Sequence, residues 1–160
     1  MNILLEFTPF AQYAIGMDHK IISWNQSCEF LTGFSEKEMI GTEKHWMPFY
    51  SHPRPVLADL IVDGKYDEIP VRYKSKCKKS TIVPNAWEAT DRFDNCGGKS
   101  KHLYWWAVPI FDNNKMFGAV TTLLDVTEQR YWELLIEKET NLLVQDNIQL
   151  KSSIKDRFRF

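Results

Sequence analysis

The side chains that could do chemistry in this chain are few and far apart. Cys28, Cys77 and Cys96 form no C-x-x-C pair and no Cys/His pair at zinc-binding spacing, and separated thiols of this kind are typical of a reduced, cytoplasmic setting. His45 and His52 lie in an aromatic, proline-broken stretch, where an imidazole could bind a metal or move a proton. Neither has a carboxylate at a recognised motif spacing, and the sequence has no nucleophile elbow, phosphate-binding loop or H-E-x-x-H motif. We therefore predict a domain that is no enzyme and holds no metal ion.

Length and charge limit the possible partners. At 160 residues the chain is long enough for one domain with a single sizeable core. Its net charge is -1 with 26% charged residues, so no charge excess predicts a nucleic acid or an anionic membrane as a partner. No segment approaches the roughly 20 apolar residues that a membrane span needs. We therefore expect no membrane span in this chain.

The N-terminal part of the sequence predicts a hairpin followed by short helices. Residues 11–24 hold two apolar runs on either side of a turn at Asp18. Asn25 is suited to cap a short helix that Gly33 ends. An S-x-x-E capping box then begins a second short helix, and three prolines within residues 48–55 exclude a regular helix there.

The middle of the chain predicts one amphipathic helix and then a surface insertion. Pro55 fits the first position of a helix that continues to Gly64, with Leu57 and Ile61 on its apolar face. The basic run 72–79 lies in a stretch without periodicity. We interpret this run as a solvated insertion, in preference to a patch that binds anions or nucleic acid, because it contains a single aromatic residue.

The C-terminal half predicts three more strands, at residues 86–94, 103–111 and 116–124. A turn in which Asn113 or Asn114 takes positive φ joins the last two. Together with the hairpin, these strands predict an α+β fold. It has a five-stranded antiparallel sheet, with the short helices inserted between the second and third strands.

The last strand is followed at once by a long helix. Asp125 and Glu128 form a D-x-x-E capping box at the first turn of this helix, and Thr127 is the rival cap. The strand therefore passes into the helix without a loop, so a movement of the strand would be transmitted to the helix. We predict that these three residues couple the two elements.

Three segments carry a family resemblance, in a fixed order along the chain. They are SWNQSCEFLTGFSEKEMIG (23–41), VPIFDNNKMFG (108–118) and DVT (125–127). Together they resemble the motifs of PAS sensor domains that end in a signalling helix, as found in bacterial and archaeal sensor histidine kinases and related signalling proteins. The resemblance implies a PAS sensor domain at residues 1–127 and a helical signalling linker at residues 128–160.

The resemblance also implies a pocket for a small molecule or a partner, shaped by the region 42–85. The candidate pocket residues are Cys28, His45, Trp46, Tyr50, His52, Leu57, Ile61, Trp87 and Trp105. Trp105 and Trp106 are adjacent on one strand, so they point to opposite faces and only one can line the interior. A bulky, filled core is the alternative to a ligand pocket, and the sequence identifies no particular ligand.

The resemblance to PAS domains makes haem and flavin the cofactors to consider. Haem-binding PAS domains can carry an axial histidine near the position of His45 and His52, but we prefer a surface or hydrogen-bonded role for both. Cys28 lies in NQSCEFL, which is superficially similar to the N-C-R-F-L-Q stretch of flavin-binding light sensors. It falls in a different helix, however, so we favour a buried structural thiol and no flavin.

The C-terminal helix carries a heptad pattern. Ile136, Leu143 and Leu150 occupy position d, while Asn147 and Ile154 occupy position a. This pattern favours a parallel two-stranded coiled coil and hence a homodimer. The alternative is a single amphipathic helix that packs on the sheet through another stripe, formed by Trp132, Leu135 and Leu142.

Residues 128–160 contain no histidine, so the phosphoacceptor helix of a histidine kinase is not in this chain. Any catalytic output would lie on another segment or on a partner signalling protein. We therefore expect a sensory and dimerisation module of a signal-transduction protein, such as a two-component system. A ligand-free scaffold for protein–protein interaction is the alternative.

Overall fold

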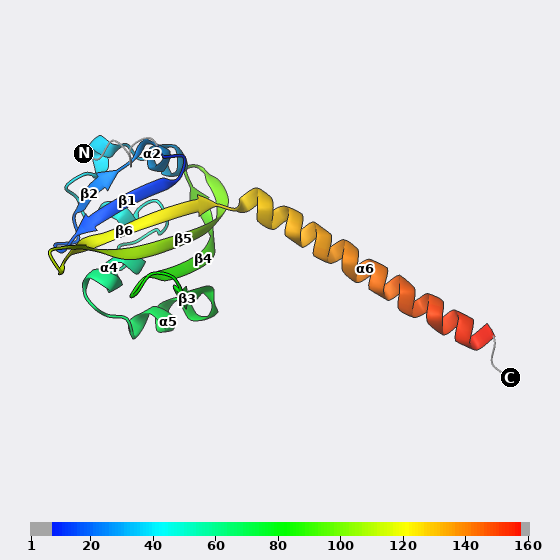
Figure 1. Cartoon of the computed structure of the whole chain (residues 1–160). Coiled ribbons are helices and arrows are strands. Elements are labelled where there is room, and N and C mark those ends of the chain that lie inside the picture. Colours follow the sequence, from blue (N-terminus) through cyan, green and yellow to red (C-terminus); the bar gives the residue numbers. More distant parts are fainter. Residues whose placement is uncertain (1–7, 158–160) are drawn as a thin grey trace. The chain divides into compact units, whose positions relative to one another are not determined.

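The computed structural model describes residues 8–157 (Figure 1). These residues form two compact units, the first ending at Val126 and the second beginning at Thr127. The first unit holds a β-sheet with short helices, and the second is formed by helix α6 (Thr127–Arg157). None of the described helices is both long and apolar enough to cross a membrane.

The first unit is built on an antiparallel sheet with the order β2-β1-β6-β5-β4-β3. Its strands are β1 (Ala11–Gly16), β2 (Ile21–Trp24), β3 (Cys77–Lys79), β4 (Trp87–Cys96), β5 (Lys99–Asp112) and β6 (Lys115–Asp125). The predicted α+β architecture is confirmed. The sheet has six described strands instead of the predicted five, because residues 77–79 of the basic run add a short edge strand to β4.

Short helical segments connect β2 to β3. They are α2 (Gln26–Thr32), α3 (Glu36–Met39), η1 (Lys44–Trp46), α4 (Leu57–Val62), α5 (Glu68–Tyr73) and η2 (Lys74–Lys76). The predicted caps are present: the Asn25 side chain accepts a hydrogen bond from the Cys28 N–H, and the Ser35 hydroxyl accepts one from the Glu38 N–H. Gly33 ends α2 with φ 80°, in the left-handed region that glycine enters at low cost.

Two predictions about the middle of the chain need correction. The helix predicted from Pro55 begins two residues later, at Leu57, because Val56 is extended and serves as its cap. The stretch in which we expected no periodicity contains α5, whose buried Ile69 and Tyr73 are spaced four residues apart on one face. Basic side chains of the run are paired with acids on β4, Lys76 with Asp91 and Lys78 with Glu88.

The core lies between the sheet and the helices, with α4 packed against β5 and β6 and α2 packed against β1. Trp24, Leu57, Ile61 and Trp105 are among its buried side chains. As predicted, only one of the two adjacent tryptophans faces this core, and the Trp106 indole instead donates a hydrogen bond to Glu88 on the other face of the sheet.

The turn and the junction at the two ends of β6 follow from its sequence. Asn113 and Asn114 both have positive φ, 51° and 64°, which suits the tight turn between β5 and β6. At the other end, Val126 alone separates β6 from α6, and its N–H donates a hydrogen bond to the carbonyl of His102 on β5. The strand thus meets the helix without a loop.

Candidate functional site

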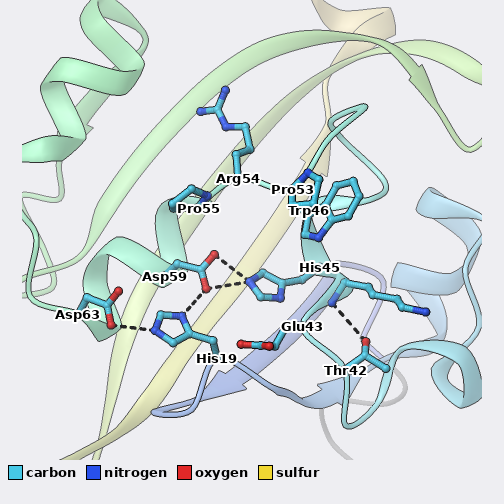
Figure 2. A pocket seen from close by; sticks show the side chains of 11 residues that line it. His19, Thr42, Glu43, His45, Trp46, Pro53, Arg54, Pro55, Asp59 and Asp63 are labelled. Atoms are coloured by element: carbon cyan, nitrogen blue, oxygen red, sulfur yellow. Dashed lines mark hydrogen bonds and ion pairs between the residues drawn. The ribbon is translucent and has the colours of Figure 1, made fainter.

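Two histidines and two aspartates meet in an open cleft of the first unit, and we name them the His–Asp cluster: His19, His45, Asp59 and Asp63 (Figure 2). His19 Nδ1 lies 2.6 Å from Asp59 Oδ1, and His19 Nε2 lies 2.8 Å from Asp63 Oδ1. His45 Nε2 lies 2.9 Å from each oxygen of Asp59. Asp59 therefore joins the two imidazole rings, while Asp63 contacts the far nitrogen of His19.

The turn between β1 and β2 positions His19. The backbone N–H of His19 donates a hydrogen bond to the Gly16 carbonyl, and the Asp18 carboxylate accepts one from the Lys20 N–H. His19 itself has φ 67°, in the left-handed region, which costs a residue with a β-carbon roughly 1–2 kcal/mol. The contacts to α4 help to hold this conformation.

Helix α4 and its C-cap supply the two carboxylates from one face, because Asp59 in the helix and Asp63 at the cap are four residues apart. Asp59 lies in the first turn and accepts a hydrogen bond of 2.9 Å from the Val56 N–H, which has no partner within the helix. Its side chain is only 10% exposed, whereas that of Asp63 is 36% exposed. The buried carboxylate is thus satisfied by three donors and the outer one by His19.

His45 enters the cluster from η1 and is buried, with 2% of its surface exposed. Because Nε2 faces an ionised carboxylate, Nε2 carries hydrogen and donates to Asp59. Its Nδ1 is buried and has no hydrogen-bond partner among the described residues. From the sequence we preferred a surface or hydrogen-bonded role for His45, and in the structure it is hydrogen-bonded to Asp59.

The charges of the cluster stabilise one another. Burial alone would raise the pKa of Asp59, but the hydrogen bond and charge of His45, the Val56 N–H and His19 lower it below its usual range. Burial alone would lower the pKa of His19, but its hydrogen bonds to Asp59 and Asp63 outweigh burial and raise it. Both shifts favour an ionised carboxylate next to a protonated imidazole.

The cleft around the cluster has a volume of about 650 Å³. Its other lining residues are Thr42, Glu43, Lys44, Trp46, Pro53, Arg54 and Pro55. In Figure 2 the Arg54 guanidinium points away from the cluster, and it lies 4.0 Å above the ring centre of Tyr50. The cleft is therefore large enough for a small molecule or for a segment of a partner.

The interior of the first unit, in contrast, is nearly filled. A cavity lined by core residues in the described part of the chain measures only about 20 Å³, and the rings of Tyr13, Tyr50, Tyr73, Phe93 and Trp105 are among those that line it. Ligand pockets usually measure about 300–1,000 Å³, so neither haem nor flavin fits this space. Burial raises the pKa of Tyr13 and Tyr73, so their hydroxyl groups stay protonated.

The structure places the predicted pocket residues in four surroundings. His45 and Trp46 line the cleft, and Tyr50 and Trp105 line the small interior cavity. His52 is exposed and lies in a surface groove that also borders Tyr50. The remaining candidates are buried in the core: Cys28, Leu57, Ile61 and Trp87.

Sequence reasoning missed His19, Asp59 and Asp63. The partners of His19 are 40 and 44 residues away in the sequence, so no local spacing connects them. One signal was available: Asp59 is the third residue of α4, where an acid can reach back to the cap N–H. Among the described residues, no group of three or more His, Cys, Asp or Glu side chains is arranged to hold a metal ion.

The three residues predicted to couple strand and helix lie on both sides of the junction between β6 and α6. Asp125 ends β6, Thr127 begins α6, and Glu128 lies in its first turn. The predicted dimer residues lie along α6, which has no buried residue in the described part of the chain. They are Ile136, Leu143, Asn147, Leu150 and Ile154.

No protein-family model and no curated protein matches the sequence. Among solved structures, an RNA-binding Light-Oxygen-Voltage receptor aligns with 90% of this chain and 36% of its own, at 14% identity and a TM-score of 0.59. This chain therefore spans about a third of that receptor. The PAS domain of BvgS from Bordetella pertussis aligns with 88% of this chain and 91% of its own, at 15% identity and a TM-score of 0.51.

A third structure, the PAS domain of an HTR-like protein from Haloarcula marismortui, aligns with 76% of this chain and 85% of its own, at 13% identity and a TM-score of 0.50. These neighbours are described as PAS domains or as a receptor, and none of the three as an enzyme. The chain has the PAS fold that its motifs predict, followed by a long helix.

Proposed function

We propose that this chain is the sensory part of a signalling protein, which reads a condition at the His–Asp cluster and passes it to α6. The observation that carries the proposal is the junction: Val126 alone separates β6 from α6, and its N–H is bonded to the His102 carbonyl of β5. The central strands of the sheet thus hold the residue next to the helix. The PAS fold supports a sensory role in general terms.

The input is placed in the cleft and not in the interior, because the interior cavity of about 20 Å³ is too small for an organic ligand. A condition at the cleft can shift α6 only by favouring one of two states of the domain. Asp125, Thr127 and Glu128 are the residues that we assign to the coupling. The small molecule or partner that our sequence interpretation placed in the PAS pocket would instead meet the outer cleft.

The output is placed on α6 and beyond it. We propose that two copies of α6 pair through the heptad positions, so that the signal takes the form of a change in this dimer. An output domain or a partner signalling protein would then respond. We assign the chain to the cytoplasm because its three cysteines are all unpaired thiols, Cys28, Cys77 and Cys96.

The coupling is tested by hydrogen–deuterium exchange of the α6 amides in the full chain. Asp59→Asn weakens the His–Asp cluster, and we expect it to change exchange in the first turns of α6. Inserting two glycines after Val126 should abolish this effect while leaving the cluster intact. Asp94→Asn, at an exposed position on β4, is the control. Unchanged α6 exchange in Asp59→Asn would refute the proposal.

A ligand-free scaffold is the second candidate function, and the filled interior favours it. A scaffold would dimerise through α6 but would not transmit changes from the cleft. The same exchange experiment separates the two functions, because the scaffold predicts a dimer whose α6 exchange is the same with and without Asp59→Asn.

A further inference from the structure

His19 has a carboxylate at each end of its ring, and this arrangement suits one protonation state. Nδ1 lies 2.6 Å from Asp59 and Nε2 lies 2.8 Å from Asp63. An ionised carboxylate only accepts hydrogen bonds, so both contacts are favourable only when both ring nitrogens carry hydrogen. That state is the imidazolium cation. In a neutral imidazole one nitrogen would direct its lone pair at a carboxylate oxygen, and that contact would be repulsive.

The two contacts of His19 differ in how firmly they are held. Asp59 is largely buried and is also fixed by His45 and by the Val56 N–H, whereas Asp63 is 36% exposed. A neutral His19 would therefore keep its hydrogen on Nδ1, facing the buried carboxylate. Asp63 would then lose its donor and turn toward water.

The protonated ring connects parts of the fold that are far apart in sequence. His19 belongs to the turn between β1 and β2, and His45 belongs to η1 (Figure 2). Asp59 belongs to α4, and Asp63 is the C-cap of this helix. The φ of 67° at His19 shows that the turn is held in a conformation that side chains with a β-carbon disfavour. Loss of the contact to Asp63 would remove one of the constraints on this turn.

We propose that the His–Asp cluster is a proton-operated clasp, in which protonated His19 ties the β1–β2 turn to α4 and loss of this proton frees the turn from Asp63. The condition read by the module would then be pH. This inference rests on the proposed function, since it names the input for the coupling to α6.

The charged and titratable groups around the ring come from its own turn, from residues 43–45, from the stretch that leads into α4, and from α4 and its C-cap. They are Asp18, Lys20, Glu43, Lys44, His45, Arg54, Asp59 and Asp63. The two groups in contact with His19 are both carboxylates, and the guanidinium of Arg54 points away from the ring (Figure 2). The immediate surroundings thus favour the cation.

The direction of the pH dependence follows from this geometry. The pKa of His19 is raised in the folded protein, so its contribution to stability is complete below the ordinary histidine value and is lost as pH rises through the folded value. The pKa of Asp59 is lowered, so its contribution is present above the ordinary aspartate value and is lost as pH falls through the folded value. The clasp is therefore closed from mildly acidic pH up to the raised pKa of His19.

The first test follows the histidine ring nitrogens of the full chain by NMR from acidic to alkaline pH. We expect His19 to titrate above the usual value of about 6.5, with both nitrogens protonated below its midpoint. In Asp63→Asn the midpoint should fall by about one pH unit, since an opposite charge has been removed. A His19 midpoint at or below 6.5, or one that Asp63→Asn leaves unchanged, would overturn the clasp.

The second test measures hydrogen–deuterium exchange of the β1–β2 turn and of α6 on both sides of that midpoint. To compare exchange at different pH, the rates are corrected for the intrinsic pH dependence of the chemistry. We expect turn protection to fall above the midpoint in the unaltered protein and to be independent of pH in His19→Asn. Asparagine suits the control variant because it tolerates positive φ. His52→Asn, at an exposed histidine outside the cluster, should behave like the unaltered protein.

The two proposals fail in different ways. If the turn opens above the midpoint while α6 exchange stays constant, the clasp holds and the coupling to α6 is wrong. If Asp59→Asn changes α6 exchange but pH and His19→Asn do not, the coupling holds and the clasp is wrong.

Discussion

Asp59 is a buried carboxylate on which three donors converge: the rings of His19 and His45 and the N–H of Val56. Its charge satisfies all three donors at once, because an ionised carboxylate has about four acceptor positions. An amide of the same shape offers one oxygen and brings two hydrogens of its own. The stability of the first unit therefore depends on the charge at this position and not only on its shape.

Replacing Asp59 with asparagine tests this dependence. We expect Asp59→Asn to lower the free energy of unfolding by about 2 kcal/mol, the usual size for a buried hydrogen bond to a charged group. Urea denaturation near neutral pH measures the change. Asp94→Asn removes a carboxylate from an exposed position on β4 and should change stability by less than about 0.5 kcal/mol. Equal stabilities of the two variants would contradict the role of Asp59.

At the residue scale the sequence predicted what depends on neighbours along the chain. The caps at Asn25 and Ser35 were predictable because each side chain bonds an N–H three residues later. The partners of Asp59 were not, because tertiary packing brings His45 to it across 14 residues and His19 across 40. Hydrogen bonds of this kind leave no periodic trace in the sequence.

Strands β1 and β6 approach each other closely at Gly118, the glycine that ends the VPIFDNNKMFG segment. A β-carbon at this position would overlap the backbone carbonyl of Ile15. Because that neighbour is backbone and not a flexible side chain, the two strands would have to separate. This explains in physical terms why glycine occupies the position.

We expect Gly118→Ala to destabilise the first unit by about 1–3 kcal/mol, the usual cost of overpacking. Thermal and urea denaturation measure the change. Phe117→Ala is a suitable control, since Phe117 lies on the same strand and is 54% exposed. A larger loss for Phe117→Ala than for Gly118→Ala would show that the strands can separate at little cost.

Helix α6 presents apolar side chains to solvent along its length, among them Leu143, Leu150 and Ile154, which are 59%, 59% and 48% exposed. A parallel dimer would bury the heptad positions. We expect the full chain to sediment as a dimer and Leu143→Asp to shift it to a monomer. Gln145→Asp adds the same charge at a heptad position away from the seam and should remain dimeric. A monomeric unaltered chain at high concentration would refute the dimer.

The elements that the sequence failed to predict are short. β3 has three residues and α5 has six, which is too few for a hydrophobic pattern of helical or strand period to be recognised. The lysines of β3 also give no hydrophobic signal that this segment pairs with β4. The long strands β5 and β6 and the turn between them were predicted because each strand contains a long run of aromatic and β-branched residues. The long elements were therefore predictable from the sequence, and the short ones were not.

For the whole molecule, the PAS motifs predicted the fold but not the state of its interior. The motifs lie at caps, turns and the strand–helix junction, which determine the course of the backbone. Whether a pocket stays open depends on how large rings such as Trp105 and Phe93 pack against one another, 5.6 Å apart between centroids. That packing is a property of the assembled core.

The filled interior makes a prediction about the purified protein. We expect a chain produced in a rich host to show neither a Soret band nor a flavin band, because the cavity of about 20 Å³ admits neither group. An absorbance spectrum and native mass spectrometry check this. Unfolded protein from the same preparation serves as the reference for tryptophan absorbance. A stoichiometric chromophore would show that the core rearranges to accept it.

The junction at Val126 also limits how this module can be joined to others. Each residue of an α-helix advances the side-chain direction by about 100°. Inserting or deleting one residue within α6 would therefore rotate every later side chain about the helix axis by about 100°. Inserting or deleting seven residues would leave the direction of these side chains nearly unchanged. Natural recombination or protein engineering that attaches a new effector to this helix should succeed at seven-residue intervals and fail between them.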